Sequence, residues 1–295
     1  MRNVPTHLLL AALPAFLVEI TLYFLTMSGR TRAWMDRFSS GHVAAGLVSS
    51  AIVTYLLYSL PLLSFRWESL ALLVLFASLV SAWYLILPRR WYADVGFLVL
   101  IAAVVLSKVF ARIYFGPHED LPGSTLGQLM WIRLGVAAAL RFRGMEGVGL
   151  GLLPTRREWA VGALQYLCFI PIGLVLSFTL KFKAFRWNNL PWWLIILTFL
   201  AMLWVVGLSE EFFFRGLLLQ WLRAWTGRVT LALAVTSLLF GAVHLPFGAF
   251  PNWRFALIAA LAGWFYGRAY LKTGSIRAAM VAHALTNITW KAFFA

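Results

Sequence analysis

The sequence predicts an all-α protein, a polytopic membrane helical bundle with about eight or nine transmembrane helices. Hydrophobic residues make up 62% of the 295 residues and charged residues 12%, and the mean hydropathy is +0.83. Soluble domains are usually nearer one half apolar. Apolar runs of spanning length, bounded by Arg, Lys, Gly or Pro, recur along the chain. They fall at about 8–27, 43–63, 69–87, 95–115, 157–180, 191–214, 229–247, 255–271 and 276–294.

The first four runs form one predicted region, residues 1–144. The first run follows Arg2 without a small-residue cleavage signal, so we interpret it as a transmembrane helix. The region ends in LGQLMWIRLGVAAALRFRG, an apolar stripe interrupted by Arg133, Arg141 and Arg143. Such a stripe favours a helix that lies in the membrane interface.

Glu19 is a carboxylate well inside the first apolar run, and that run holds no basic or imidazole partner. A charge in lipid is costly. We therefore expect a neutral, hydrogen-bonded packing role for Glu19.

The net charge of +15 points to lipid rather than to nucleic acid. The basic residues are scattered singly and in pairs through the connections between apolar segments, as the positive-inside rule requires. We expect the bilayer as a partner and no nucleic acid. A multi-pass protein of the cell (inner) membrane is the expected localisation, and the oligomeric state stays open.

The second predicted region, residues 145–295, holds the polar groups that are suited to chemistry. Glu210, Glu211 and Arg215 lie together in the apolar stretch WVVGLSEEFFFRGLLL. Glu211 and Arg215 are four residues apart, on one helical face, and can neutralise each other. Glu210 points about 100° away. An unpaired carboxylate in a dry site has the profile of a general base.

His244 closes the next apolar run, in LLFGAVHLPF. With a turn at Thr226 and Gly227, Glu210 and His244 are each 17 residues from Gly227. Equal distances in an antiparallel hairpin place both at one depth, about 25 Å from the turn. Phe240, four residues before His244, could wall the site against water or simply pack against its neighbours.

His283 and Asn287 lie one turn apart on one face of the last predicted helix. An imidazole and an amide can hold a metal, a water molecule or a developing oxyanion. His283 is only nine residues from Gly274, however, so its depth matches that of His244 only if the two turns differ in height.

The helix from Pro191 to Trp225 is too long for one straight span, so we expect it to protrude or to break near Gly207.

These residues resemble three motifs, EExxxR, FxxxH and HxxxN, of the CPBP membrane proteases, which comprise the type II CAAX prenyl endopeptidases and the ABI proteins. Here they are Glu210 to Arg215, Phe240 to His244 and His283 to Asn287. The run from Gly263 to Gly267 is also similar, and its two glycines suit close helix contact. The resemblance covers about residues 145–295.

The resemblance implies an intramembrane endopeptidase that hydrolyses a membrane-associated or C-terminally anchored protein or peptide. Glu210 would activate water and His244 would position it. His283 and Asn287 would stabilise the oxyanion, while Glu211 and Arg215 would hold the site together.

The family is described as both metalloprotease and glutamic protease, and the residues are compatible with either account. We favour a metal-free glutamate mechanism with no cofactor. If zinc or another divalent metal were present, its ligands would be Glu210, His244 and His283, because the chain has no HExxH.

Two other functions compete with the enzyme. One is a non-catalytic membrane regulatory or immunity protein of the same family, against which the complete set of motifs argues. The other is a proton-coupled transporter, which predicts internal repeats, and the two halves of the chain do not resemble each other.

Overall fold

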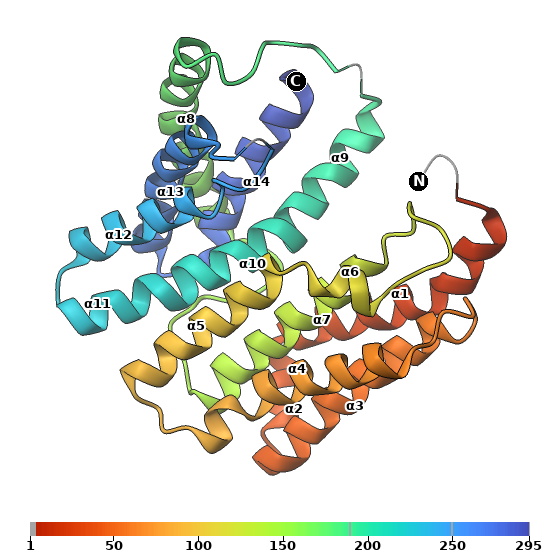
Figure 1. Ribbon diagram of the computed structural model, residues 1–295. Coiled ribbons are helices and arrows are strands. Elements are labelled where there is room, and N and C mark those ends of the chain that lie inside the picture. Colours follow the sequence, from red (N-terminus) through yellow and green to blue (C-terminus); the bar gives the residue numbers. More distant parts are fainter. Residues whose placement is uncertain (1–3, 189, 249, 295) are drawn as a thin grey trace. The chain divides into compact units, whose positions relative to one another are not determined.

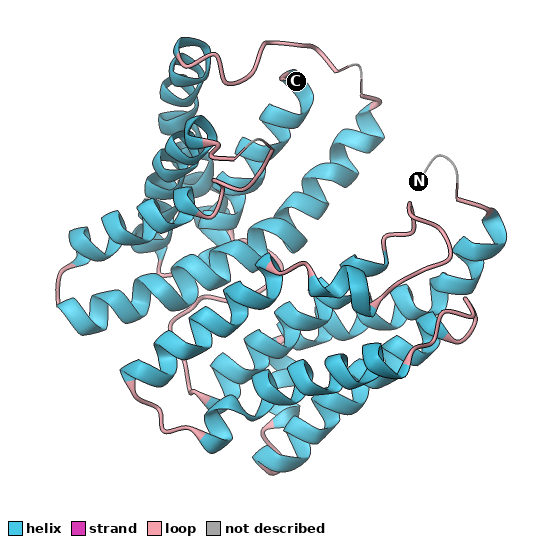
Figure 2. Cartoon of the chain, in the orientation of Figure 1, coloured by secondary structure: helices cyan, strands magenta, loops and turns pink. Residues whose placement is uncertain are grey.

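The computed structural model describes residues 4–188, 190–248 and 250–294. These residues form helices joined by loops, as Figure 2 shows, so the predicted all-α class is confirmed. The described chain divides into two compact units, residues 1–146 and 147–295. Figure 1 labels the helices of both units.

Unit 1 is built on long helices that turn small and aromatic residues inward. Its buried side chains include Ala15, Tyr23, Tyr55 and Leu73. The helices are α1 (Thr6–Met27), α2 (Gly29–Met35), α3 (Ser40–Ser59), α4 (Trp67–Ile86), α5 (Trp91–Leu106), α6 (Val109–Ile113) and α7 (Gly123–Ala137), which continues into a π-helical turn (Ala138–Phe142).

The expectation of an interfacial helix before residue 144 is wrong. An interfacial helix keeps a polar face in water, whereas α7 is buried around most of its circumference, including Leu126, Met130, Trp131 and Leu134. The arginine that interrupts its apolar stripe is buried as well, because it has an ionic partner inside the unit.

That partner is Glu19, so the neutral role expected for Glu19 is also wrong. Arg133 Nε lies 2.6 Å from Glu19 Oε1, and both side chains are buried. Ser50 Oγ accepts a hydrogen bond from Arg133 Nη1 at 2.8 Å, and Thr54 Oγ1 donates one to Glu19 Oε2 at 3.0 Å. The role is structural, as expected, but it is that of an ion pair that joins α1 to α7.

A second ion pair fixes the end of unit 1. Arg143 donates to both carboxylate oxygens of Asp94, at 2.6 and 2.9 Å, in the two-point geometry that suits a guanidinium. Tyr84 Oη donates to the same carboxylate at 3.0 Å. The hydrogen bond to Asp94 raises the pKa of Arg143.

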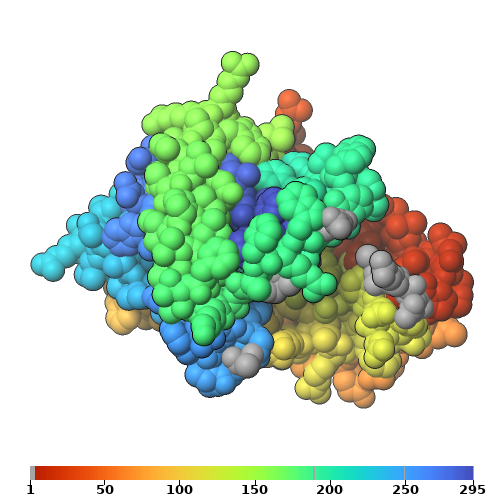
Figure 3. All heavy atoms as spheres, turned by 90° about the horizontal axis from the view of Figure 1, so that it is seen from above, coloured from red at the N-terminus to blue at the C-terminus, as the bar shows by residue number. Residues whose placement is uncertain are grey.

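Unit 2 packs four helices and one long helix around a core of small residues. The four are α8 (Arg156–Thr179), α12 (Val229–Ala242), α13 (Trp253–Thr273) and α14 (Ile276–Phe293). A Cβ at Gly162 of α8 would meet the Ala278 carbonyl at 2.6 Å. Such close contacts are typical of membrane helices, where small residues let backbones approach. In the space-filling view, part of α14 is visible between α8 and α9 (Figure 3).

The long helix runs without a break from Trp192 to Thr226. It comprises α9 (Trp192–Ala201), a π-helical segment (Met202–Gly207), α10 (Leu208–Glu211), a second π-helical segment (Phe212–Leu219) and α11 (Gln220–Thr226). Of the two expectations, a protruding helix or a break near Gly207, the break is not found, and Gly207 lies where the long helix approaches α14. A Cβ there would lie 3.6 Å from Met280 Cα of α14.

Five of the described helices are long and apolar enough to cross a membrane: α1, α3, α4, α8 and the long helix. Two more, α5 and α12, are apolar but shorter. These helices make the chain an integral membrane protein. The number of about eight or nine spans stays a prediction.

Candidate active site

Glu210 and Glu211 lie in α10, the single α-helical turn between the two π-helical segments of the long helix. A π-helical turn holds one more residue than an α-helical turn, and such turns are frequent at functional sites. The turn after Thr226 is a left-handed cap at Gly227, with φ of 67°, where the sequence places it.

Glu211 and Arg215 form the predicted ion pair. Arg215 Nη1 lies 2.9 Å from Glu211 Oε2, and neither side chain is exposed. Arg215 Nη2 also donates to the Gly263 carbonyl of α13 at 2.6 Å. The pair therefore holds the long helix to α13.

Two glycines of α13 make room for the guanidinium. A Cβ at Gly263 would lie 3.2 Å from Arg215 Nη2, and one at Gly267 would lie 4.0 Å from Arg215 Nε. The guanidinium carbon lies 4.8 Å from the ring centre of Phe240 and 5.5 Å from that of Tyr266. Cation–π attraction adds to the ion pair at such distances.

His283 of α14 lies between the two glutamates. Its Nδ1 is 2.8 Å from Glu211 Oε1, and its Nε2 is 3.9 Å from Glu210 Oε2. The first distance is a hydrogen bond, in which Nδ1–H donates to the carboxylate. This bond orients the ring, so that Nε2 faces Glu210.

Glu210 differs from Glu211 in its surroundings. Its Oε2 atom is buried and has no hydrogen-bond partner among the described residues. The side chain as a whole is 35% exposed, however, so the carboxylate also has an open side. The two glutamates therefore differ in exposure and partners, and the roles expected for them stay predictions.

His244 follows the end of α12, where its ring is held by backbone and aromatic contacts. Nδ1 lies 2.7 Å from the Phe240 carbonyl oxygen, within hydrogen-bond distance. The ring centre is 5.0 Å from that of Phe240 and 4.6 Å from that of Phe255. Phe240 also contacts the His283 ring, at 5.8 Å, so one buried phenyl ring touches both histidines.

Asn287 lies one turn after His283 on α14, and its Nδ2 is 3.7 Å from Met202 Sδ of the long helix. No hydrogen bond joins it to Glu210, His244 or His283 within the described residues. The structure thus gathers Glu210, Glu211, Arg215 and His283 in direct contact or near it. Phe240 joins them to His244, and Asn287 stands one turn away.

The described residues contain no group of three His, Cys, Asp or Glu side chains placed to hold a metal ion. Glu210, His244 and His283 are the donors that zinc would use. His244 Nδ1 and His283 Nδ1 already bond to a carbonyl and to a carboxylate, which leaves one ring nitrogen of each. One remaining ring nitrogen on each histidine is also what a metal-bound histidine keeps, so the metal-free mechanism stays a prediction.

Tyr266 is a site residue that the motifs did not single out. Its ring is stacked on His283, with centres 4.8 Å apart and planes 16° apart. It lies between Gly263 and Gly267, in a run whose glycines indicated only close helix contact. An aromatic residue flanked by two packing glycines is the signal that could have identified it.

A helical bundle that buries Glu211, Arg215 and His283 and holds the partly exposed Glu210 beside them belongs to the class of membrane proteins with an intramembrane polar site. Residues 191–289 match the family model described as type II CAAX prenyl endopeptidase, Rce1-like. Over this segment, about a third of the chain, the protein is similar to the CAAX protease (CPBP) family. Comparison with curated proteins and comparison with solved structures each gave no match.

Proposed function

We propose that this protein is an intramembrane endopeptidase in which Glu210 activates a water molecule. The observation that carries the proposal is the pair formed by Glu210 Oε2 and His283 Nε2, 3.9 Å apart. This separation is too long for a direct hydrogen bond, and a water molecule that bonds to both atoms fits it. Such a water would form hydrogen bonds to Glu210 and to the imidazole of His283 at the same time.

In the proposed reaction, Glu210 takes a proton from water while the hydroxide oxygen attacks the carbonyl carbon of the scissile peptide. The carbonyl oxygen becomes an oxyanion, which His283 Nε2–H and the Asn287 amide stabilise. The C–N bond then breaks, and Glu210 returns its proton to the leaving nitrogen. His244 helps to position and polarise the water.

The supporting residues explain why this geometry persists in an apolar interior. Arg215 neutralises Glu211, and Glu211 fixes the imidazole of His283. Phe240 is buried against both histidines and excludes water from that side. Preorganised charges in a dry site cost little reorganisation during reaction.

We propose a protein or peptide that is membrane-associated or anchored by its C-terminus as the substrate, and the cell (inner) membrane as the location. The bilayer is the second partner. The family match supports the peptidase class, and the long apolar helices support the membrane.

A comparison of membrane and secreted fractions from cells with wild-type protein and with Glu210→Ala tests the function. We expect at least one protein to keep an uncleaved terminus in the variant, which mapping of peptide termini detects. The variant must be present in the membrane at the wild-type level. If it is folded and no terminus changes, the peptidase proposal is refuted.

Metal content tests the metal-free form of the mechanism. Purified protein is expected to hold zinc well below one equivalent, with no change in His244→Ala, by inductively coupled plasma mass spectrometry. His7→Ala, in unit 1, is the matched control. Stoichiometric zinc that is lost only in His244→Ala would contradict the metal-free mechanism.

A further inference from the structure

The depth of His283 requires an explanation, because it lies nine residues from Gly274 whereas Glu210 lies 17 residues from Gly227. The two turns differ in burial. Gly227 and Gly274 are both exposed, but Ser275 and Ile276, which follow Gly274, are buried, whereas Arg228 and Val229, which follow Gly227, are exposed. The side of the turn that leads into α14 is therefore covered by other residues of unit 2, and we call the turn between α13 and α14 the sunken turn.

A loop, residues 147–155, covers the sunken turn. The Val148 carbonyl accepts a hydrogen bond from Ile276 N at 3.0 Å, and the Gly149 carbonyl accepts one from Ser275 Oγ at 3.0 Å. Gly149 has φ of 64°, and a Cβ there would lie 2.6 Å from Ser275 Oγ. Only glycine suits this position, where the loop and the turn touch.

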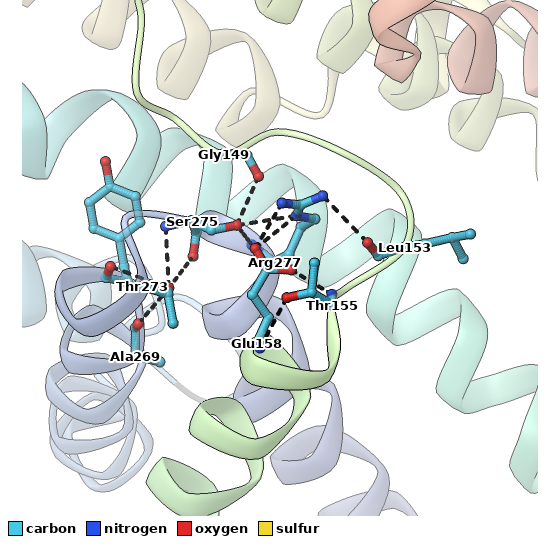
Figure 4. Close-up of polar contacts among 9 residues, drawn as sticks. Gly149, Leu153, Thr155, Glu158, Ala269, Thr273, Ser275 and Arg277 are labelled. Carbon is cyan, nitrogen blue, oxygen red and sulfur yellow. Dashed lines mark hydrogen bonds and ion pairs between the residues drawn. The ribbon is translucent and has the colours of Figure 1, made fainter.

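Glu158 and Arg277 close the same contact with an ion pair. Arg277 Nη2 lies 2.8 Å from Glu158 Oε1, and Arg277 Nε donates to Ser275 Oγ at 3.2 Å. Figure 4 shows these side chains converging between the first turns of α8 and α14. We call Glu158, Ser275 and Arg277 the clamp.

Both oxygens of Glu158 are used. Oε2 accepts from the Thr155 backbone N–H at 2.6 Å, as part of a capping box, and Oε1 accepts from Arg277. Arg277 stands in the first turn of α14, where the helix dipole disfavours a cation. The negative charge of Glu158 offsets this cost, which favours the ion pair between Glu158 and Arg277.

The clamp acts on the site through helix α14, which carries both Arg277 and His283. His283 is seven residues after Ile276 in one continuous helix, a distance of about 10 Å, so an axial shift of the first turn moves His283 equally. The loop also holds the long helix, since Trp204 Nε1 donates to the Leu152 carbonyl at 2.8 Å. One loop thus bonds to both the helix that carries the proposed base, Glu210, and the helix that carries the proposed oxyanion donor, His283.

We infer that Glu158, Ser275 and Arg277 are positioning residues, which set the depth of His283 opposite Glu210. This inference rests on the proposed function for its effect on catalysis, but the helix register that it predicts can be measured without any activity.

The register is tested by cross-linking. In a Cys168→Ser background, Met202→Cys and Asn287→Cys place two thiols where the native side chains lie 3.7 Å apart. With dibromobimane as the probe, we expect the cross-linking rate to fall several-fold when Arg277→Ala or the milder Glu158→Gln is added. Arg268→Ala, at an exposed arginine of the same unit, should leave the rate unchanged. An unchanged rate in both clamp variants would overturn the inference.

Catalysis supplies the second readout, on a peptide that spans the terminus mapped in the proteomic comparison. Misplacement by about 1 Å can cost ~10²-fold in rate, so Arg277→Ala should lower kcat by up to that factor with KM little changed. Arg277→Lys, which keeps the charge, should restore part of the loss. Wild-type kcat in Arg277→Ala would overturn the inference. If the wild-type protein cleaves nothing while the clamp variants alter cross-linking, the proposed function fails and the clamp stands.

Discussion

Replacing Glu210 with glutamine is expected to lower kcat by ~10²–10⁴-fold, the contribution of a positioned general base. The amide keeps the size of the side chain but cannot take a proton from water. KM should change little, because the substrate contacts remain. Initial rates on the mapped peptide, measured with purified protein in detergent or in vesicles, provide both constants.

The control for this variant is Glu68→Gln, at an exposed glutamate of unit 1, which should keep wild-type kinetics. The Glu210→Gln protein should also unfold near the wild-type temperature, because Glu210 Oε2 has no hydrogen-bond partner to lose. Retained kcat in Glu210→Gln would exclude Glu210 as the base.

Arg215→Met is expected to lower the free energy of unfolding by about 3–5 kcal/mol, the cost of removing one partner of a buried ion pair. The methionine side chain is unbranched and apolar, but it leaves the Glu211 carboxylate buried with only the His283 imidazole as a partner. Thermal unfolding in detergent, followed by tryptophan fluorescence, measures the loss.

A second substitution identifies the cause. If the lost stability reflects an uncompensated charge, Glu211→Gln combined with Arg215→Met should recover a large part of it, since no unpaired carboxylate is left. Arg268→Met, at an exposed site, should cost no more than about 0.5 kcal/mol. A stable Arg215→Met protein would contradict a charged Glu211.

The sequence predicted best those features that depend on neighbours along the chain. The ion pair between Glu211 and Arg215 follows from their spacing of four residues. The turn at Gly227 follows from the glycine itself, which readily adopts the left-handed conformation found there. Apolar runs likewise gave the helices of both units, because the length of a span is a local property.

Contacts between segments that are far apart in the sequence leave no local pattern and could not be predicted in this way. Glu19 and Arg133 are 114 residues apart, and without their contact each looked like a different kind of residue: a neutral carboxyl and a charge at an interface. The sunken turn of α13 and α14 was missed for the same reason. The turn is covered by the loop of residues 147–155, and nothing in the composition of this loop indicates that it packs against the turn.

The site itself stands between these two cases. The motifs placed Glu210, His244 and His283 in one membrane interior, but the hydrogen bond from His283 to Glu211 rather than to Glu210 spans 72 residues and needed the fold. The π-helical segments around Leu208–Glu211 also left no mark in the sequence pattern.

Arg215, Glu211, His283 and Glu210 form a row in which each charged group contacts or faces the next. Two of these side chains, Glu211 and Glu210, are acidic, and the other two, Arg215 and His283, are basic. In the proposed reaction Glu210 accepts a proton from water, so the negative charge moves from Glu210 to the oxyanion and is not created anew in lipid. The proposed reaction therefore moves an existing charge next to basic side chains, which avoids the large cost of forming a new charge in a medium of low dielectric constant.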